Sequence, residues 1–142
     1  MEYISAEEFL KQPKEVQRVF LDWWKKNYDE EDLVGYIGKS ITYIKSFPNT
    51  LKHTAWDCFD IGQEIILLFT EGQLRKFIED KTKGIVKVIQ WNPCVDDNRY
   101  GYTIYILAKN EYKVLRHIEY KKLGTDLLQA YWKVACEIAK EC

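Results

Sequence analysis

Residues that could hold a charged or aromatic ligand alternate along the chain between positions 102 and 122. From Lys109 to Lys122 there are five basic and two acidic residues, which gives this stretch a local charge of +3. Successive side chains of a strand point to opposite faces of a sheet. A hairpin over 102–121 would therefore gather one set on one face: Thr103, Tyr105, Lys113, His117 and Lys121. Cations beside an aromatic ring on a sheet can hold phosphates and stack a base. The alternative is an ordinary solvated face built from residues that suit cross-strand pairs.

The polar loop predicted before this hairpin is a second candidate contact. It covers residues 92–101 and carries Arg99 and Tyr100. Arginine and tyrosine are enriched among the anchors of protein interfaces. The candidate partner-binding residues are therefore these six: Tyr105, Lys113, His117, Lys121, Arg99 and Tyr100.

The histidines and carboxylates do not form a pattern that predicts a metal site. His53 and His117 are the two histidines of the chain, and no ligand spacing recurs around them. The segment 96–98 has the sequence Asp-Asp-Asn but lacks the spacing and the glycine of a calcium loop. We therefore expect a plain turn there, and no metal.

The cysteines and glycines give no catalytic motif either. No C-x-x-C pair links the four cysteines, and no glycine motif for binding phosphates is present. A cysteine-dependent enzyme that uses Cys94 or Cys58 is an alternative, but no nucleophile signature surrounds either thiol. We therefore expect no catalytic residue and no cofactor, and we interpret all four cysteines as reduced thiols: Cys58, Cys94, Cys136 and Cys142.

Composition and charge describe an ordinary folded chain. The 142 residues are 46% hydrophobic and 15% aromatic, which excludes a mainly disordered chain. The net charge of −1 argues against a general nucleic-acid coat and against a strongly acidic DNA mimic. The chain begins without an apolar signal segment, and its longest aliphatic run is too short to span a membrane. We therefore expect a cytoplasmic protein with no membrane partner.

Helix signals mark the two ends and the middle of the chain. Ser5 and Glu8 form a capping box, and Pro13 restarts a helix that ends near Lys26. A second capping box at residues 70–73 opens a short helix through Lys81, with Gly84 as its C′ residue. The spacing of apolar residues predicts an amphipathic helix over residues 124–142 with this buried face: Leu128, Tyr131, Trp132, Ala135, Ile138 and Cys142.

Strand signals fill the remaining segments. Residues 33–37 and 40–45 read as a hairpin around a two-residue turn at Gly38-Lys39. Residues 55–61 and 64–69 read as another strand pair around Gly62-Gln63. Residues 85–91 read as a further strand, rich in β-branched types. In the hairpin over 102–121, a three-residue loop would set Ala108 opposite Tyr112 and Ile106 opposite Val114. The acidic stretch 29–32 reads as a solvated loop.

These elements predict one α+β domain over residues 1–142. A largely antiparallel sheet would have one face covered by an N-terminal and a C-terminal amphipathic helix, with a short middle helix beside them. The other face would be left for solvent, self-association or a partner.

Three stretches resemble small hypothetical proteins of prophages and phages of Gram-positive bacteria: residues 7–24, 68–82 and 123–141. They contain the helix stripes and caps, so the resemblance implies a shared scaffold more than a shared site. It also implies a context, because short phage accessory proteins without enzymatic motifs often bind host machinery, as anti-CRISPR proteins do.

The sequence thus leads us to expect a non-enzymatic phage accessory protein that binds a host protein or ribonucleoprotein complex, for example as an inhibitor of a CRISPR-Cas defence system. A nucleic-acid-binding protein of phage replication or regulation is the first alternative, and the cysteine-dependent enzyme is the second. Self-association into a homo-oligomer is left open.

Overall fold

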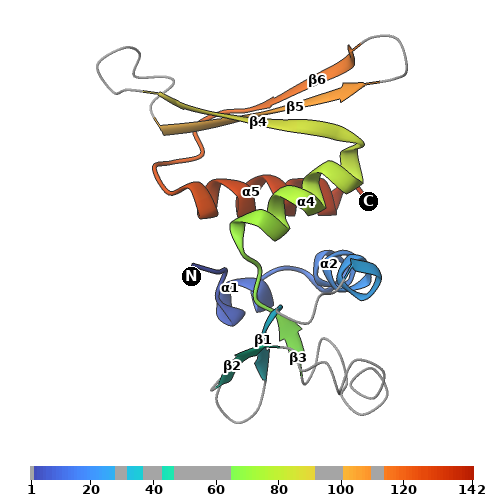
Figure 1. Ribbon diagram of the computed structural model, residues 1–142, viewed down its shortest axis with the longest axis vertical. Helices are drawn as coiled ribbons and strands as arrows, with labels where there is room; N and C mark the ends of the chain where they lie inside the picture. Colours follow the sequence, from blue (N-terminus) through green and yellow to red (C-terminus); the bar gives the residue numbers. More distant parts are fainter. Residues whose placement is uncertain (1, 28–31, 37–42, 47–64, 92–100, 110–113) are drawn as a thin grey trace. The chain divides into compact units, whose positions relative to one another are not determined.

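The computed structural model describes residues 2–27, 32–36, 43–46, 65–91, 101–109 and 114–142. The described chain forms two compact units, Tyr3–Phe69 and Thr70–Cys142. Each unit contains helices and a three-stranded antiparallel sheet, and Figure 1 labels the elements of both. The predicted α+β class is confirmed, although the strands form two sheets instead of one. The expected single domain over 1–142 stays a prediction.

The N-terminal unit begins with two helices that the capping signals locate correctly. Helix α1 spans Ala6–Leu10, and the Ser5 hydroxyl accepts a hydrogen bond from the Glu8 N–H at 3.2 Å. Helix α2 spans Lys14–Asn27. Gln17 is buried, and its side-chain amide donates to the carbonyl oxygen of Gln12 at 2.8 Å. This bond ties α2 to the turn between the helices.

The sheet of the N-terminal unit has the strand order β2-β1-β3, with β1 at Leu33–Tyr36, β2 at Tyr43–Ser46 and β3 at Ile65–Leu67. Tyr36 lies opposite Tyr43, whereas a two-residue turn at Gly38-Lys39 would have set it opposite Ile41. The predicted tight hairpin is therefore wrong in register. Strand β3 pairs with β1, and the strand predicted at 55–61 lies outside the described residues.

Aromatic rings form the core of this unit. Phe20 and Phe69 have ring centroids 5.1 Å apart, and Phe9 and Trp23 each lie 6.3 Å from Phe69. All four side chains are buried. Since a buried Phe or Trp is worth several kcal/mol, this cluster is what secures α1 and α2 to the end of β3.

Asp32 corrects one prediction from the sequence. It belongs to the acidic stretch that we expected to be solvated, but it is buried and accepts a 2.8 Å hydrogen bond from the indole N–H of Trp24. A buried carboxylate needs such partners, because an unpaired charge away from water is costly. The bond connects α2 with the start of β1.

The C-terminal unit begins with α4 (Glu71–Thr82) and β4 (Gly84–Trp91). The predicted cap at Thr70 is present, since its backbone N–H donates to Gln73 Oε1 at 2.9 Å. Lys83, and not Gly84, takes the left-handed position that ends the helix. Gly84 is needed for another reason: a Cβ there would lie 2.8 Å from Ile106 Cγ2 of the neighbouring strand.

Strands β5 (Gly101–Lys109) and β6 (Val114–Tyr120) complete a sheet of order β4-β5-β6. Ile106 lies opposite Ile118, four residues beyond the Val114 that we predicted, and Ala108 lies opposite Arg116 instead of Tyr112. The predicted register is therefore wrong. From Ile104 to Ala108 the shift is an even number of residues, so each side chain there stays on its predicted face; between Ala108 and Lys109 the register changes, and Lys109 lies opposite Val114.

Helix α5 (Leu127–Lys140) lies beside α4 on one face of this sheet (Figure 1). Asp126 is its N-cap, since the carboxylate accepts from the Gln129 N–H at 2.9 Å; the helix thus begins later than predicted. Most of the predicted stripe is buried: Leu128, Tyr131, Trp132, Ala135 and Ile138. Cys142 is exposed beyond the helix end. The middle helix α4 shares the C-terminal sheet with α5, and the predicted cover by the N-terminal helix stays a prediction.

Candidate binding surface on the C-terminal sheet

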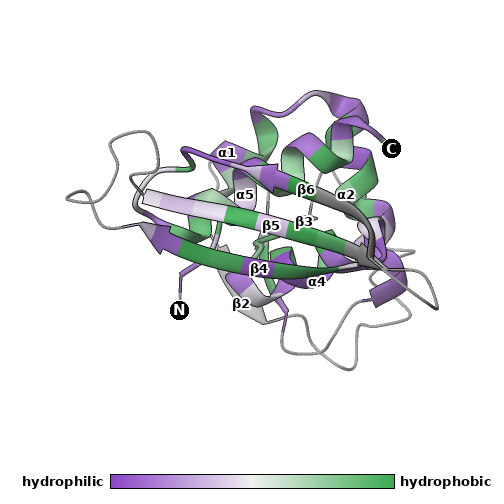
Figure 2. Ribbon diagram, turned by 90° about the horizontal axis from the view of Figure 1, so that it is seen from above, coloured by the Kyte–Doolittle hydropathy of each residue, from purple (hydrophilic) through white to green (hydrophobic). Residues whose placement is uncertain are grey.

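Successive side chains of β4 and β5 point alternately to a covered face and to an open face of the sheet. Val86, Ile104 and Ile106 are buried on the side of α4 and α5. The neighbouring positions point to the other side, from which Figure 2 views the sheet; the ribbon there is coloured apolar along much of β4 and β5, for residues of either side. We call this side the open face. Its described residues, by register and alternation, are Ile85, Lys87, Ile89, Trp91, Thr103, Tyr105, Leu107 and Glu119.

Two isoleucines of β4 are exposed on the open face. Ile85 is 41% exposed and Ile89 is 38% exposed, and they are the large hydrophobic side chains that stand out in this way among the described residues. Lys87 lies between them on the same side of the strand and is also exposed. Ile85 also lies opposite the half-buried Leu107, and exposed apolar patches with a polar surround are typical of interaction sites.

Trp91 closes one end of the open face. It lies opposite Gly101, which has no side chain, and its indole N–H donates to the Thr103 hydroxyl at 3.0 Å. Thr103 is only 1% exposed although it belongs to the open face. This end is therefore held by a specific contact, and the exposed apolar area lies along β4 and the middle of β5.

One row of residues crosses the open face at the middle of β5. Lys87 lies opposite Tyr105 on one side, and Glu119 lies opposite Tyr105 on the other. The Lys121 ammonium lies 3.7 Å from the Glu119 carboxylate, and both side chains are largely exposed. Such an exposed pair contributes little to stability. The row thus places a cation, an aromatic ring and an anion side by side across the three strands.

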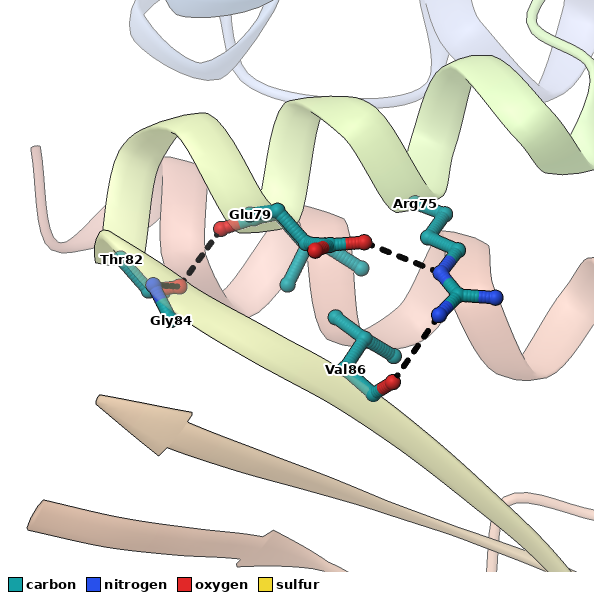
Figure 3. A network of polar contacts seen from close by, with 6 residues as sticks. Arg75, Glu79, Thr82, Gly84 and Val86 are labelled. Atoms are coloured by element: carbon teal, nitrogen blue, oxygen red, sulfur yellow. Dashed lines mark hydrogen bonds and ion pairs between the residues drawn. The ribbon is translucent and has the colours of Figure 1, made fainter. Parts of the chain in front are cut away.

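The outer edge of β4 is held by Arg75 of α4. Its guanidinium donates to the Val86 carbonyl oxygen at 3.2 Å and to Glu79 Oε1 at 2.9 Å (Figure 3). The hydrogen bond with Glu79, followed by the charge interaction with Tyr131, raises the pKa of Arg75. Arg75 therefore remains a cation throughout the accessible pH range. An edge-strand carbonyl that is already bonded is less able to pair with another strand.

The turn from α4 into β4 fixes the position of that edge. The Thr82 hydroxyl donates to the Ile78 carbonyl oxygen at 2.7 Å, and it accepts from the Gly84 N–H at 3.3 Å. Figure 3 shows these bonds at the helix end from which β4 starts. They satisfy groups that a helix end leaves unpaired, so β4 begins in a defined position beside α4.

The residues predicted as a site are only partly described. Tyr105 is half-buried on the open face, and Lys121 is exposed at the end of β6 beside Glu119. The backbone of His117 pairs with that of Leu107. Three of the predicted residues lie outside the described part of the chain: Lys113, Arg99 and Tyr100.

The predicted binding residues did not include Ile85, Lys87 and Ile89. We interpreted residues 85–91 simply as a strand. The sequence does contain a sign of an exposed apolar face. Isoleucine and valine occupy both the odd and the even positions of this segment, whereas a half-solvated strand normally alternates apolar with polar residues. Both faces of β4 therefore carry apolar residues, and within the described C-terminal unit α4 and α5 cover one of them.

Other parts of the described chain offer less for a site. Among the described residues no group of three or more His, Cys, Asp or Glu side chains could hold a metal ion. Of the cysteines in the described ranges, Cys136 is buried and Cys142 is exposed, while Cys58 and Cys94 lie outside them. A pocket of about 200 Å³ lies between the C-terminal ends of α4 and α5 and the strand β6; small-molecule sites are usually larger, at about 300–1,000 Å³, and mostly apolar.

Comparisons with protein-family models, with curated proteins and with solved structures find no match to this chain. None of the helices in the described segments has the length and the apolar composition needed to cross a bilayer.

Proposed function

We propose that this chain is a non-enzymatic binding protein that docks another protein on the open face of its C-terminal sheet. The observation that carries the proposal is the exposure of Ile85 and Ile89, at 41% and 38%, on a sheet whose opposite side is closed by two helices. Leaving apolar surface of this size in water is unfavourable by about 25 cal/mol per Å². A partner that covers it removes that cost.

The charges of the open face favour a protein partner over a nucleic acid. Phosphate binding depends on several cations acting together and on counterion release. The described part of this region has Lys87 and Lys121 but also Glu119, which lies 3.7 Å from the Lys121 ammonium. An apolar centre with balanced charges around it is the usual composition of a protein interface.

We further propose that the partner is a protein of a bacterial host. This step rests on the resemblance of three stretches to phage and prophage proteins, and it is an argument from context. In this proposal the protein acts by steric occlusion: a bound copy covers the surface that the host protein needs for its own complex, for example a CRISPR-Cas ribonucleoprotein of a defence system.

The test is affinity capture from bacterial lysate with three immobilised proteins, each used with and without nuclease. They are the wild type, the variant Ile89→Asp and the variant Gln90→Asp. The two variants introduce the same charge at adjacent exposed positions of β4, but Gln90 lies on the opposite parity and serves as a matched control.

The proposal predicts a host protein that the wild type and Gln90→Asp retain and that Ile89→Asp loses, independently of nuclease. We expect its affinity for Ile89→Asp to fall at least about tenfold, as is typical when a central apolar contact is lost. Capture that disappears with nuclease would favour the nucleic-acid alternative. Capture that does not depend on Ile89 would refute the open face as the contact surface.

A further inference from the structure

We infer that the open face also binds a second copy of this chain, through a two-fold axis that runs parallel to the strands above β5. The inference rests on the proposed function in that it uses the same face as a protein contact, and it adds the identity of one partner. It follows from the register of the three strands and from the order of charges along one row.

The row at the middle of the sheet is self-complementary. Lys87, Tyr105 and Glu119 lie at one level on β4, β5 and β6. A two-fold rotation about an axis parallel to β5 turns a second sheet over and reverses its strand order while keeping the level of each residue. Lys87 then faces Glu119 of the second copy, Glu119 faces Lys87 of the second copy, and Tyr105 meets its equivalent at the axis.

The other simple two-fold arrangement is electrostatically unfavourable. An axis across the strands would keep the strand order and reverse the direction, so that β4 would lie over β4 of the second copy. Lys87 would then face Lys87, and Glu119 would face Glu119. Like charges brought together at an interface disfavour association, so the charges select the axis that runs along the strands.

The middle position of Tyr105 matters for this geometry. Two packed sheets cross at about 30° because each sheet is twisted, and the crossing separates residues in proportion to their distance from the point where the sheets cross. Tyr105 is the central residue of β5, which spans Gly101–Lys109. The Lys87 and Glu119 pairs therefore lie where the two sheets remain best aligned.

Apolar residues flank the row on the open face. Ile85 lies opposite Leu107 on one side of it, and Ile89 lies opposite Thr103 on the other. The exposed parts of Ile85 and Ile89 would be covered by the second sheet. An isologous contact of this kind has two equivalent charge pairs at its middle and apolar residues on both sides of them, as the symmetry of a dimer requires.

Pairing of two copies along the edge of β4 is less favourable than pairing of their faces. The Val86 carbonyl at this edge already accepts a hydrogen bond from Arg75, which Glu79 holds in place. A strand added at this edge would have to displace the guanidinium.

The size of the sheet sets the strength of the dimer. Three strands about 4.8 Å apart and about 27 Å long present a flat area of about 400 Å² per copy. Both copies together then bury about 800 Å², below the roughly 1,200 Å² of a stable complex. We therefore expect a weak, reversible dimer with a dissociation constant on the order of 100 μM.

The test is sedimentation velocity of the purified full chain from about 10 μM to about 1 mM, a range chosen to bracket that dissociation constant. The variants are Lys87→Glu, Glu119→Lys, the double swap with both changes, and Lys76→Glu. Lys76 is exposed on α4, so the last variant controls for the same change of net charge away from the open face. Circular dichroism verifies that every variant is folded.

We expect each single charge reversal on the row to raise the dissociation constant about tenfold, since it turns two equivalent attractive pairs into repulsive ones. The double swap should return it to within about threefold of the wild type. Lys76→Glu should leave it unchanged. A wild-type chain that remains monomeric over the whole range, or single reversals that the double swap does not rescue, would overturn the inference.

These outcomes separate the inference from the proposed function. A monomeric chain that still captures a host protein through Ile89 refutes the dimer and leaves the proposed function standing. A chain that dimerises as expected, but whose Ile89→Asp variant retains every captured host protein, refutes the host-binding function and leaves the dimer standing.

Discussion

Replacing Gly101 with alanine should destabilise the C-terminal unit by about 2–4 kcal/mol. Gly101 starts β5 with φ of +92°, and a Cβ at this position would lie 2.5 Å from the Gly124 carbonyl oxygen. That oxygen accepts the Tyr102 N–H at 2.8 Å, so it has no free direction in which to move. Alanine therefore has to leave the left-handed region or break this bond.

The magnitude follows from these two costs. An alanine held at positive φ is less favourable than glycine by about 1–2 kcal/mol, and loss of the Tyr102 hydrogen bond costs about 1 kcal/mol more. Displacement of the backbone at Gly124 adds to both, because Leu123 is tied to the same strand by its own N–H, at 3.2 Å from the Tyr102 carbonyl oxygen.

Urea unfolding followed by circular dichroism measures the effect, and Gly72→Ala is the matched control. A Cβ at Gly72 would have no atom within 4 Å, and the residue is exposed in the first turn of α4. The same substitution should there be stabilising, by about 0.4–1 kcal/mol, because it reduces the entropy of the unfolded chain. If Gly101→Ala were as stable as the wild type, the close approach of Gly124 to β5 would be refuted.

Three further predictions concern buried groups. Trp132→Ala should lower the free energy of unfolding by about 3–5 kcal/mol, because the ring is 5% exposed in the core of the C-terminal unit; an unchanged melting temperature would contradict this assignment. Asp32→Ala should cost about 1–3 kcal/mol, since it removes the acceptor of the buried Trp24 indole N–H; chemical unfolding measures this, with Asp22→Ala on the exposed side of α2 as the control. Burial raises the pKa of Tyr131 above its usual value of 10.0 although the charge of Arg75 lowers it. The folded state thus keeps a proton that the unfolded state loses, and stability should fall as pH rises above about 10; Tyr131→Phe should show a smaller fall, and an equal fall in both proteins would refute this role of Tyr131.

Local signals in the sequence were sufficient to locate most of the helices. Ser5 caps α1, Thr70 caps α4, and the apolar periodicity of Val16, Phe20 and Trp24 marks the buried side of α2. These features depend on residues three or four positions apart, which is the range over which a helix makes its own contacts. The observed helix ends differ from the predicted ones by a few residues, as at Asp126, because neighbouring side chains can each serve as a cap.

The faces of the strands were also predictable, but their register was not. Alternation along β5 and β6 assigned Ile106 and Ile118 to the covered side correctly. It could not distinguish pairing of Ile106 with Val114 from pairing with Ile118, because registers that differ by an even number of residues keep every side chain on its face. Only the return of the chain from β6 to Tyr102, through Leu123 and Gly124, fixes the observed alignment.

For the candidate site too, the sequence predicted the local features and only the pairing of the strands decided the rest. The sequence located Tyr105 and Lys121 on one sheet face, since parity along a strand is a local property. It did not indicate that Lys87 and Glu119 lie at the same level on either side of Tyr105, because that row joins three strands far apart in the chain. Nor did it indicate that Ile85 and Ile89 are exposed, since an isoleucine in a strand is usually buried.

What the sequence by itself determined was therefore the identity of the helices, the N-caps at Ser5 and Thr70, and the sidedness of β5. Tertiary structure alone decided that α4 lies with α5 on the C-terminal sheet, that Asp32 is buried against Trp24, and that Ile85 and Ile89 of β4 are exposed. Local periodicity shows which residues are apolar on one side of an element. Which partner covers that side depends on contacts between segments distant in sequence, and these exist only once the chain has folded.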